Sequence, residues 1–135
     1  RAQAVTFLWR AAGSPAPETG TMPFADVPAD SYYYDAVLWA VEHGIAKGTS
    51  DTTFGPGASC TRAQIVAFLY RAFGTPVGGD AAFTDTTPNA YYAEALRWAI
   101  GTGVTTGTSR TTFSPNANCT RAQIVTFLWR CKKAN

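Results

Sequence analysis

Charge, histidine and long apolar runs are all scarce in this sequence of 135 residues. Charged residues make up 15% of it, the formal net charge is +2, and no basic block exists beyond Lys132 and Lys133. Proteins that bind nucleic acid gather lysine and arginine on one face, so this composition excludes nucleic acid as a partner. No run approaches the roughly 18 apolar residues that a membrane-spanning helix needs, and we expect no membrane insertion.

The single histidine, His43, restricts the catalytic chemistry. Serine and cysteine nucleophiles need a base such as an imidazole, and His43 is interpreted more simply as the C-terminal cap of a helix. Asp51 suggests calcium, but the matching residue of a second copy is Arg110, which would repel a metal ion. The sequence contains no group of metal ligands with suitable spacing. We therefore predict that the chain is not an enzyme and uses no metal and no cofactor.

Cysteine is also rare, with three residues at positions 60, 119 and 131. An exported protein can form disulfides, but three is an odd number, and the distances that decide pairing do not follow from a sequence. Cys60 and Cys119 occupy the same place in two copies of a repeat, where they are interpreted as small buried apolar residues. Their disulfide state stays open on this basis.

Apolar residues make up 46% of the chain and aromatic residues 13%, a composition typical of a globular protein with a core. Phe24-Ala25-Asp26 matches Phe83-Thr84-Asp85, and from there two copies run without a gap at a spacing of 59 residues. The repeat predicts units that bury their apolar faces against one another. We predict one structural module made of the tail of a first repeat at 1–20, a second repeat at 21–77 and a third at 78–135. We expect the natural start to lie upstream.

Each complete copy begins with a predicted helix, which runs from about Ser31 to His43 in the second repeat. Apolar residues recur there at helical spacing. Asp30 and its counterpart Asn89 are predicted to be N-cap residues. Gly44 and Gly103 stand where a left-handed residue commonly ends a helix.

A loop rich in glycine, proline, serine and threonine follows from Lys47 to Ser59. Its phenylalanine, Phe54 or Phe113 in the two copies, is predicted to enter the core from a stretch of turn residues. A second helix is predicted from about Arg62 to Phe73, with Gly74 after its end. Helices joined by such loops make the predicted fold class all-α.

The second helix opens with Thr61-Arg62-Ala63-Gln64, the pattern of a capping box. The Thr61 hydroxyl is expected to accept from the amide of Gln64, and the Gln64 side chain from the amide of Thr61. Cys60 and Ile65 flank the box as a hydrophobic staple. Such a cap stabilises a helix by about 1 kcal/mol, so these residue types have a structural reason to be there.

The arginine of the box recurs as Arg1, Arg62 and Arg121. A cation in the first turn of a helix faces the positive end of its dipole, which costs a few tenths of a kcal/mol. Two interpretations remain. The arginine forms an anion site together with the helix N-terminus, or it forms an ion pair with Asp26, Asp85 or Asp35.

These features together resemble the S-layer homology domain family. The matching motifs are Phe-x-Asp-Val from Phe24, the Tyr-Tyr…Ala-Val-x-Trp-Ala helix from Tyr32, the Gly-Thr…Thr-Phe-x-Pro loop from Gly48, and Thr-Arg-Ala-Gln from Thr61. The resemblance covers essentially the whole chain. It implies a pseudo-threefold helical module of three repeats, found on secreted bacterial proteins, that docks them onto a polysaccharide of the cell wall. In several relatives that polymer is anionic and carries a pyruvylated amino sugar.

The resemblance also implies a set of ligand-binding residues. The arginine would clamp a ligand carboxylate, and the Phe-x-Asp aspartate would accept from sugar hydroxyls or orient an arginine. The loop glycine would let the backbone approach a sugar, and the tryptophan of the first helix either stacks on a sugar or packs in the core. The family's glutamate is replaced here by glutamine, which removes a negative charge. The implied residues are Arg1, Arg62, Arg121, Asp26, Asp85, Gln64, Gln123, Gly48, Gly107, Trp39 and Trp98.

The predicted function is therefore a non-catalytic module that anchors a protein to the bacterial cell wall or surface layer through grooves between repeats. The alternative is a structural or self-assembly module of a surface layer, without affinity for glycan. The predicted partners are a cell-wall polysaccharide or peptidoglycan-linked polymer, and other surface-layer proteins.

Overall fold

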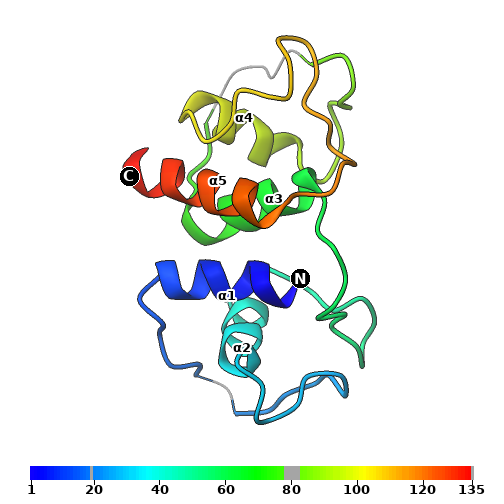
Figure 1. Ribbon diagram of the computed structural model, residues 1–135, viewed down its shortest axis with the longest axis vertical. Coiled ribbons are helices and arrows are strands. Elements are labelled where there is room, and N and C mark those ends of the chain that lie inside the picture. The colour runs from blue at the N-terminus through cyan, green and yellow to red at the C-terminus, as the bar shows by residue number, and fades with distance from the viewer. Residues whose placement is uncertain (19, 78–82, 135) are drawn as a thin grey trace. The chain divides into compact units, whose positions relative to one another are not determined.

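The computed structural model describes residues 1–18, 20–77 and 83–134 (Figure 1). These residues form helices and no strand, apart from an isolated antiparallel bridge between Thr61 and Asn118. The predicted all-α class is confirmed. The helices are α1 (Ala2–Ala11), α2 (Tyr34–Glu42), α3 (Arg62–Phe73), α4 (Ala93–Gly101) and α5 (Arg121–Ala134).

The chain divides into two compact units, Arg1–Ser59 and Cys60–Asn135. In the first unit α1 packs against α2, and in the second unit α3 packs against α4 and α5. Each unit therefore joins the second helix of one repeat to the first helix and loop of the next. The repeat bounds and the threefold arrangement stay predictions, and the expected start of the third repeat at 78 lies outside the described residues.

The first helix of each complete repeat begins later than predicted. The N-cap residue of α2 is Tyr33, without a side-chain cap, and the N-cap residue of α4 is Tyr92. The predicted N-caps at Asp30 and Asn89 are wrong because the chain forms a separate turn there. Ser31 N–H donates to Pro28 O at 3.1 Å, and the Ser31 hydroxyl donates to the same oxygen at 2.7 Å.

The ends of these two helices agree with the prediction. Gly44 has a φ of +69° and Gly103 a φ of +80°, a left-handed conformation that glycine adopts at little cost. His43 is the C-cap residue of α2, as predicted. Its Nδ1 lies 2.9 Å from Trp39 O, one turn back.

The second helices begin with the predicted capping boxes. The Thr61 hydroxyl accepts from Gln64 N–H at 3.1 Å, and the Gln64 side chain accepts from Thr61 N–H at 2.9 Å. Thr120 and Gln123 make the same pair of bonds at 3.1 and 3.0 Å. α3 runs from Arg62 to Phe73, as predicted.

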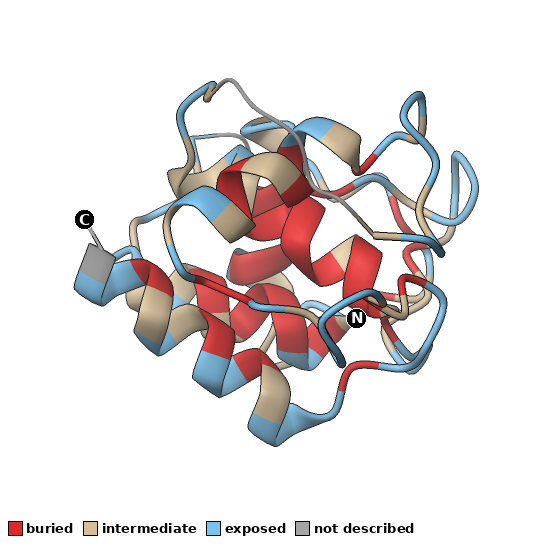
Figure 2. Ribbon diagram, turned by 90° about the horizontal axis from the view of Figure 1, so that it is seen from above, coloured by how far each residue is buried: buried red, intermediate tan, exposed pale blue. Residues whose placement is uncertain are grey.

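Loop phenylalanines reach the core, as predicted. Phe54 and Phe113 are both fully buried, although each lies in a loop of polar and turn-forming residues. Figure 2 shows buried residues concentrated on the helices and exposed residues along the loops. Within the described part of the chain, no helix has the length and apolar character needed to cross a membrane.

Candidate functional site

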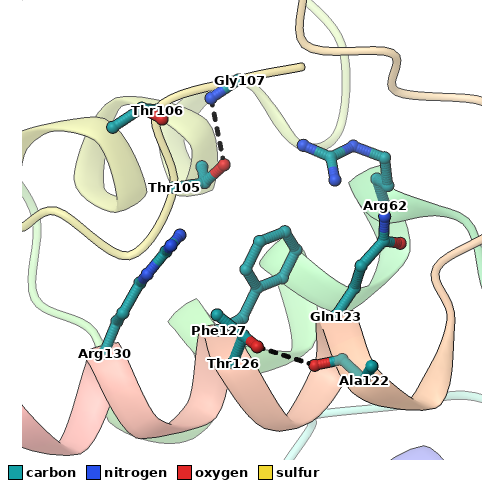
Figure 3. A pocket seen from close by; sticks show the side chains of 9 residues that line it. All are labelled: Arg62, Thr105, Thr106, Gly107, Ala122, Gln123, Thr126, Phe127 and Arg130. Atoms are coloured by element: carbon teal, nitrogen blue, oxygen red, sulfur yellow. Dashed lines mark hydrogen bonds between the residues drawn. The ribbon is translucent and has the colours of Figure 1, made fainter.

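A groove opens in the second unit between the start of α3, the segment after α4 and one face of α5 (Figure 3). Its volume is about 280 Å³. The described residues that line it include two arginines, three threonines and a glutamine, but no carboxylate. We call it the α3–α5 groove, and its lining residues are Arg62, Thr105, Thr106, Gly107, Ala122, Gln123, Thr126, Phe127 and Arg130.

Arg62 forms one wall of this groove from the first position of α3. Its Nε donates to Phe113 O at 2.8 Å, and its guanidinium carbon lies 4.9 Å from the ring centre of Phe113 and 5.3 Å from that of Phe127. The residue is only 4% exposed, so only a small part of its side chain is open to the groove. Burial lowers the pKa of its guanidinium from the usual value, and the charge of Asp85 opposes that shift.

Neither the anion-site nor the ion-pair interpretation predicted that Arg62 donates to a backbone carbonyl, that of Phe113. No described carboxylate lies within ion-pair distance of Arg62, so the ion-pair interpretation is not supported there. The Nε bond leaves both terminal nitrogens without a hydrogen bond to a described residue. Figure 3 shows the guanidinium turned toward the groove. The loop carbonyl and the rings therefore orient the cation, and its outer edge remains available to an anion.

Arg1 repeats this arrangement in the first unit. Its Nε donates to Phe54 O at 3.0 Å, and its guanidinium carbon lies 4.8 Å from the centre of the Phe54 ring. Its Nη2 also donates to the carbonyl of Lys47. Arg121, by contrast, is exposed and is not among the residues that line the groove. The three arginines are equivalent in sequence but differ in environment.

The two predicted aspartates hold the loops in place. Asp26 accepts from the amides of Phe54 at 2.8 Å and Gly55 at 2.9 Å. Asp85 accepts from the amides of Phe113 at 2.9 Å and Ser114 at 2.8 Å. These bonds fix the carbonyl to which the arginine donates, so the aspartates position Arg1 and Arg62 indirectly.

These contacts change the acidity of both carboxyls. The Phe54 amide lowers the pKa of Asp26 below its usual value against an opposing effect of burial. Burial raises the pKa of Asp85, but the two loop amides and the nearby Arg62 outweigh it, so that pKa is also lowered. Both residues are therefore carboxylates at neutral pH.

The loop residues Gly48 and Gly107 must be glycine because a Cβ atom at either position would overlap neighbouring atoms of the protein. A Cβ at Gly107, where φ is +95°, would lie 2.6 Å from Thr112 O. A Cβ at Gly48 would lie 2.4 Å from the Phe24 ring. Gly107 lines the groove, and its N–H donates to Thr105 Oγ1 at 3.1 Å.

The remaining predicted residues divide between groove and core. Gln123 lines the groove, and Gln64 is its counterpart in the capping box of α3. Trp39 is 5% exposed and Trp98 is 2% exposed. Trp98 packs against Tyr70, with ring centres 5.7 Å apart. These values fit core packing, the alternative to sugar stacking that the sequence left open for the tryptophans.

Arg130 and Trp129 were not predicted from the sequence as site residues. Arg130 lines the groove opposite Arg62 in Figure 3, and its Nη1 lies 3.4 Å from Val104 O. A second hollow of about 450 Å³ shares Arg130 with the groove, and its lining residues are Thr102, Gly103, Trp129, Arg130 and Lys133. Trp129 is 61% exposed, and Lys133 Nζ lies 5.0 Å from the centre of its ring.

A sequence signal for Arg130 did exist. The second helix carries an arginine nine residues after the first one in every copy, at Arg10, Arg71 and Arg130. An arginine that recurs at one position of the second helix indicates a candidate binding residue as well as the arginine of the capping box does. Arg62, Arg130 and Lys133 together make a basic strip that continues from the α3–α5 groove to Trp129.

Comparison with known proteins assigns this architecture to a family. The S-layer homology domain family matches residues 23–66 and 82–125. The surface-layer 125 kDa protein of Lysinibacillus sphaericus is 36% identical over 126 residues, which are 90% of this chain and 10% of that protein. An endoglucanase of Bacillus sp. (strain KSM-635) is 34% identical over 108 residues, covering 79% of this chain and 11% of the enzyme. The S-layer protein sap of Bacillus anthracis is 31% identical over 107 residues, covering 78% of this chain and 13% of that protein.

This chain belongs to the S-layer homology domain family, as its motifs predicted. The chain spans about a tenth of the length of the relatives it matches. It is a cell-surface anchoring module, and the predicted location at the bacterial cell surface is confirmed. The match to the endoglucanase covers 11% of that enzyme, so it assigns no glycan hydrolysis to this chain.

Proposed function

We propose that this chain anchors its parent protein by binding an anionic polysaccharide of the cell wall in the α3–α5 groove. The observation that carries the proposal is the presence of Arg62 and Arg130 in a groove whose described lining has no carboxylate. Such a site favours a ligand with a negative charge between the two guanidinium groups. A pyruvyl substituent on an amino sugar has a carboxylate of this kind.

The rest of the lining suits the sugar that carries this charge. Thr105, Thr106 and Thr126 supply hydroxyl groups. The Thr105 hydroxyl already accepts from Gly107 N–H and can still donate. The Thr126 hydroxyl already donates to Ala122 O and can still accept. Each charge-assisted bond from an arginine to a carboxylate contributes roughly 1.5–3 kcal/mol. The exposed indole of Trp129 offers a flat apolar surface to the next sugar of the polymer.

Isothermal titration with purified wall polysaccharide tests the proposal. Arg130→Ala should weaken binding at least tenfold, because it removes one of two cations without disturbing the Phe113 contact of Arg62. Arg10→Ala is the matched control, since Arg10 holds the same motif position, is exposed and lies in the first unit. Removal of the acidic substituents from the polymer should weaken binding by a similar factor. Equal affinity of the wild type and Arg130→Ala would refute the proposal.

A second candidate function is association with another repeat, and it is favoured by the exposed face of α5. Val125 is 49% exposed, whereas its equivalents Val5 and Val66 are fully buried. Trp129 extends the same apolar face. A module that assembles through this face should sediment as a larger species at higher concentration, and Val125→Glu should abolish that change. A concentration-independent monomer would exclude self-association.

A further inference from the structure

Two cysteines from different repeats lie directly opposite each other at the start of α3. Thr61 and Asn118 form an antiparallel bridge, so the next pair in register is Cys60 and Cys119. Cys119 N–H donates to Cys60 O at 2.8 Å, and Arg62 N–H donates to Ala117 O at 2.9 Å. These bonds fix the register on both sides of the bridge.

This register places the two side chains within reach of each other. Residues directly opposite in an antiparallel pair point to the same face, and the Cα atoms of a hydrogen-bonded pair lie about 5.5 Å apart. Disulfides span Cα separations of about 4.4–6.8 Å. The register therefore predicts a Cα separation for Cys60 and Cys119 that a disulfide can span, and both are buried free thiols in the structure.

Cys60 and Cys119 share a buried environment, and each affects the other electrostatically, as expected of two neighbouring thiols. Cys60 is 4% exposed and Cys119 is 9% exposed. Burial raises the pKa of the Cys119 thiol to about 11, with Arg62 opposing the shift and Cys60 adding to it. A thiol of this kind is almost wholly protonated at neutral pH and reacts slowly in the folded protein.

We propose that Cys60 and Cys119 form a disulfide in the mature protein. The cell-surface location of the family supports this, because disulfides form and persist in oxidising compartments. One thiolate attacks the S–S bond of an oxidant such as glutathione disulfide, which forms a mixed disulfide and releases one thiolate of the oxidant. The other cysteine thiolate then attacks the mixed disulfide, forms the Cys60–Cys119 bond and releases the second thiolate. The cysteines lose two protons and two electrons, and the oxidant takes up the electrons. Since both thiols are buried after folding, the reaction occurs while the chain folds.

A disulfide between Cys60 and Cys119 would stabilise the shape of the α3–α5 groove. Cys60 immediately precedes the N-cap of α3, and Cys119 precedes Thr120 before α5. A disulfide between them ties together the two helix starts that carry Arg62 and Gln123 into the α3–α5 groove. It also closes a loop of about 60 residues, and a cross-link over such a length stabilises mainly by restricting the unfolded chain.

Peptide mapping tests the bond independently of any ligand. Protein refolded with glutathione disulfide is alkylated in denaturant without reductant, digested with trypsin and examined by mass spectrometry. The expected product links peptide 48–62 to peptide 111–121, with Cys131 alkylated in its own peptide. Alkylation of all three cysteines, or a link that includes Cys131, would overturn the proposal. Failure of polysaccharide binding would leave this result unaffected.

Thermal melting gives a second measurement. Reduction should lower the Tm of the wild type and of Cys131→Ser by about 10 °C, as expected for a loop of this length in a domain of this size. Reduction should leave the Tm of a Cys60→Ser/Cys119→Ser variant unchanged. A wild-type Tm that does not respond to reduction would also contradict the disulfide.

Discussion

Replacement of Asp85 by asparagine should destabilise the second unit and loosen the groove without touching its lining. The Asp85 carboxylate accepts from the amides of Phe113 and Ser114 at 2.9 and 2.8 Å. Asparagine keeps one carbonyl oxygen and loses the charge. A hydrogen bond to a charged group contributes roughly 1.5–3 kcal/mol, and the solvent exposure of Asp85 reduces that value. We expect a loss of about 1–2 kcal/mol in the free energy of unfolding.

Urea denaturation measures this loss. With an m-value of about 2 kcal/mol/M, the midpoint of Asp85→Asn should fall by roughly 0.5–1 M. Asp51→Asn is the matched control, because Asp51 is an exposed aspartate in a loop and should leave the midpoint unchanged. Equal midpoints for the two variants would refute the conclusion that Asp85 holds the loop.

The same argument predicts a pH dependence. Because the folded-state pKa of Asp85 is lowered, its contribution is fully present above the unfolded pKa of about 4 and is lost as pH falls through the lower folded value. The difference between the wild type and Asp85→Asn should therefore be constant near neutral pH and shrink below about pH 4. A difference that persists unchanged at pH 2 would show that the charge of Asp85 does not contribute.

The remaining predictions concern stability and can be checked by the same denaturation assay. Thr120→Ala should cost about 0.5–2 kcal/mol through loss of the N-cap, and an unchanged midpoint would rule out the capping role. Gly107→Ala should destabilise, since its Cβ would lie 2.6 Å from a carbonyl oxygen at a positive φ, whereas Gly101→Ala meets open space and should be tolerated. Arg62→Ala should cost about 1–3 kcal/mol because it removes the bond to a buried carbonyl, and Arg121→Ala, at an exposed site, should change little. Equal effects of the two arginine variants would contradict the difference in their environments.

Local features of this protein follow from its sequence. The bounds of α3, the capping box at Thr61 and the left-handed Gly44 were all predictable, because each depends on residues within a few positions of one another. The repeat spacing and four ordered motifs also identified the family. The start of α2 was missed because a turn around Ser31 competes with the predicted N-cap at Asp30.

The tertiary structure decided how these local elements are used. The sequence left an anion site and an ion pair open for Arg62, and folding brings Phe113 O, 51 residues downstream, to its Nε. Asp85 likewise accepts from the amides of Phe113 and Ser114, which are 28 and 29 residues away. The family resemblance implied that this aspartate contacts a sugar or orients an arginine, and in the structure its carboxylate holds the loop.

The composition of the groove and the pairing of the cysteines were also decided by folding. Arg130 enters the groove because α5 packs on α3, while Trp98 of the neighbouring helix is buried in the core. Cys60 and Cys119 are 59 residues apart in sequence and become neighbours through one antiparallel bridge. Helix signals extend over a few residues along the chain, whereas these contacts depend on which distant segments pack together, and that is fixed only when the apolar faces of the helices are buried against one another.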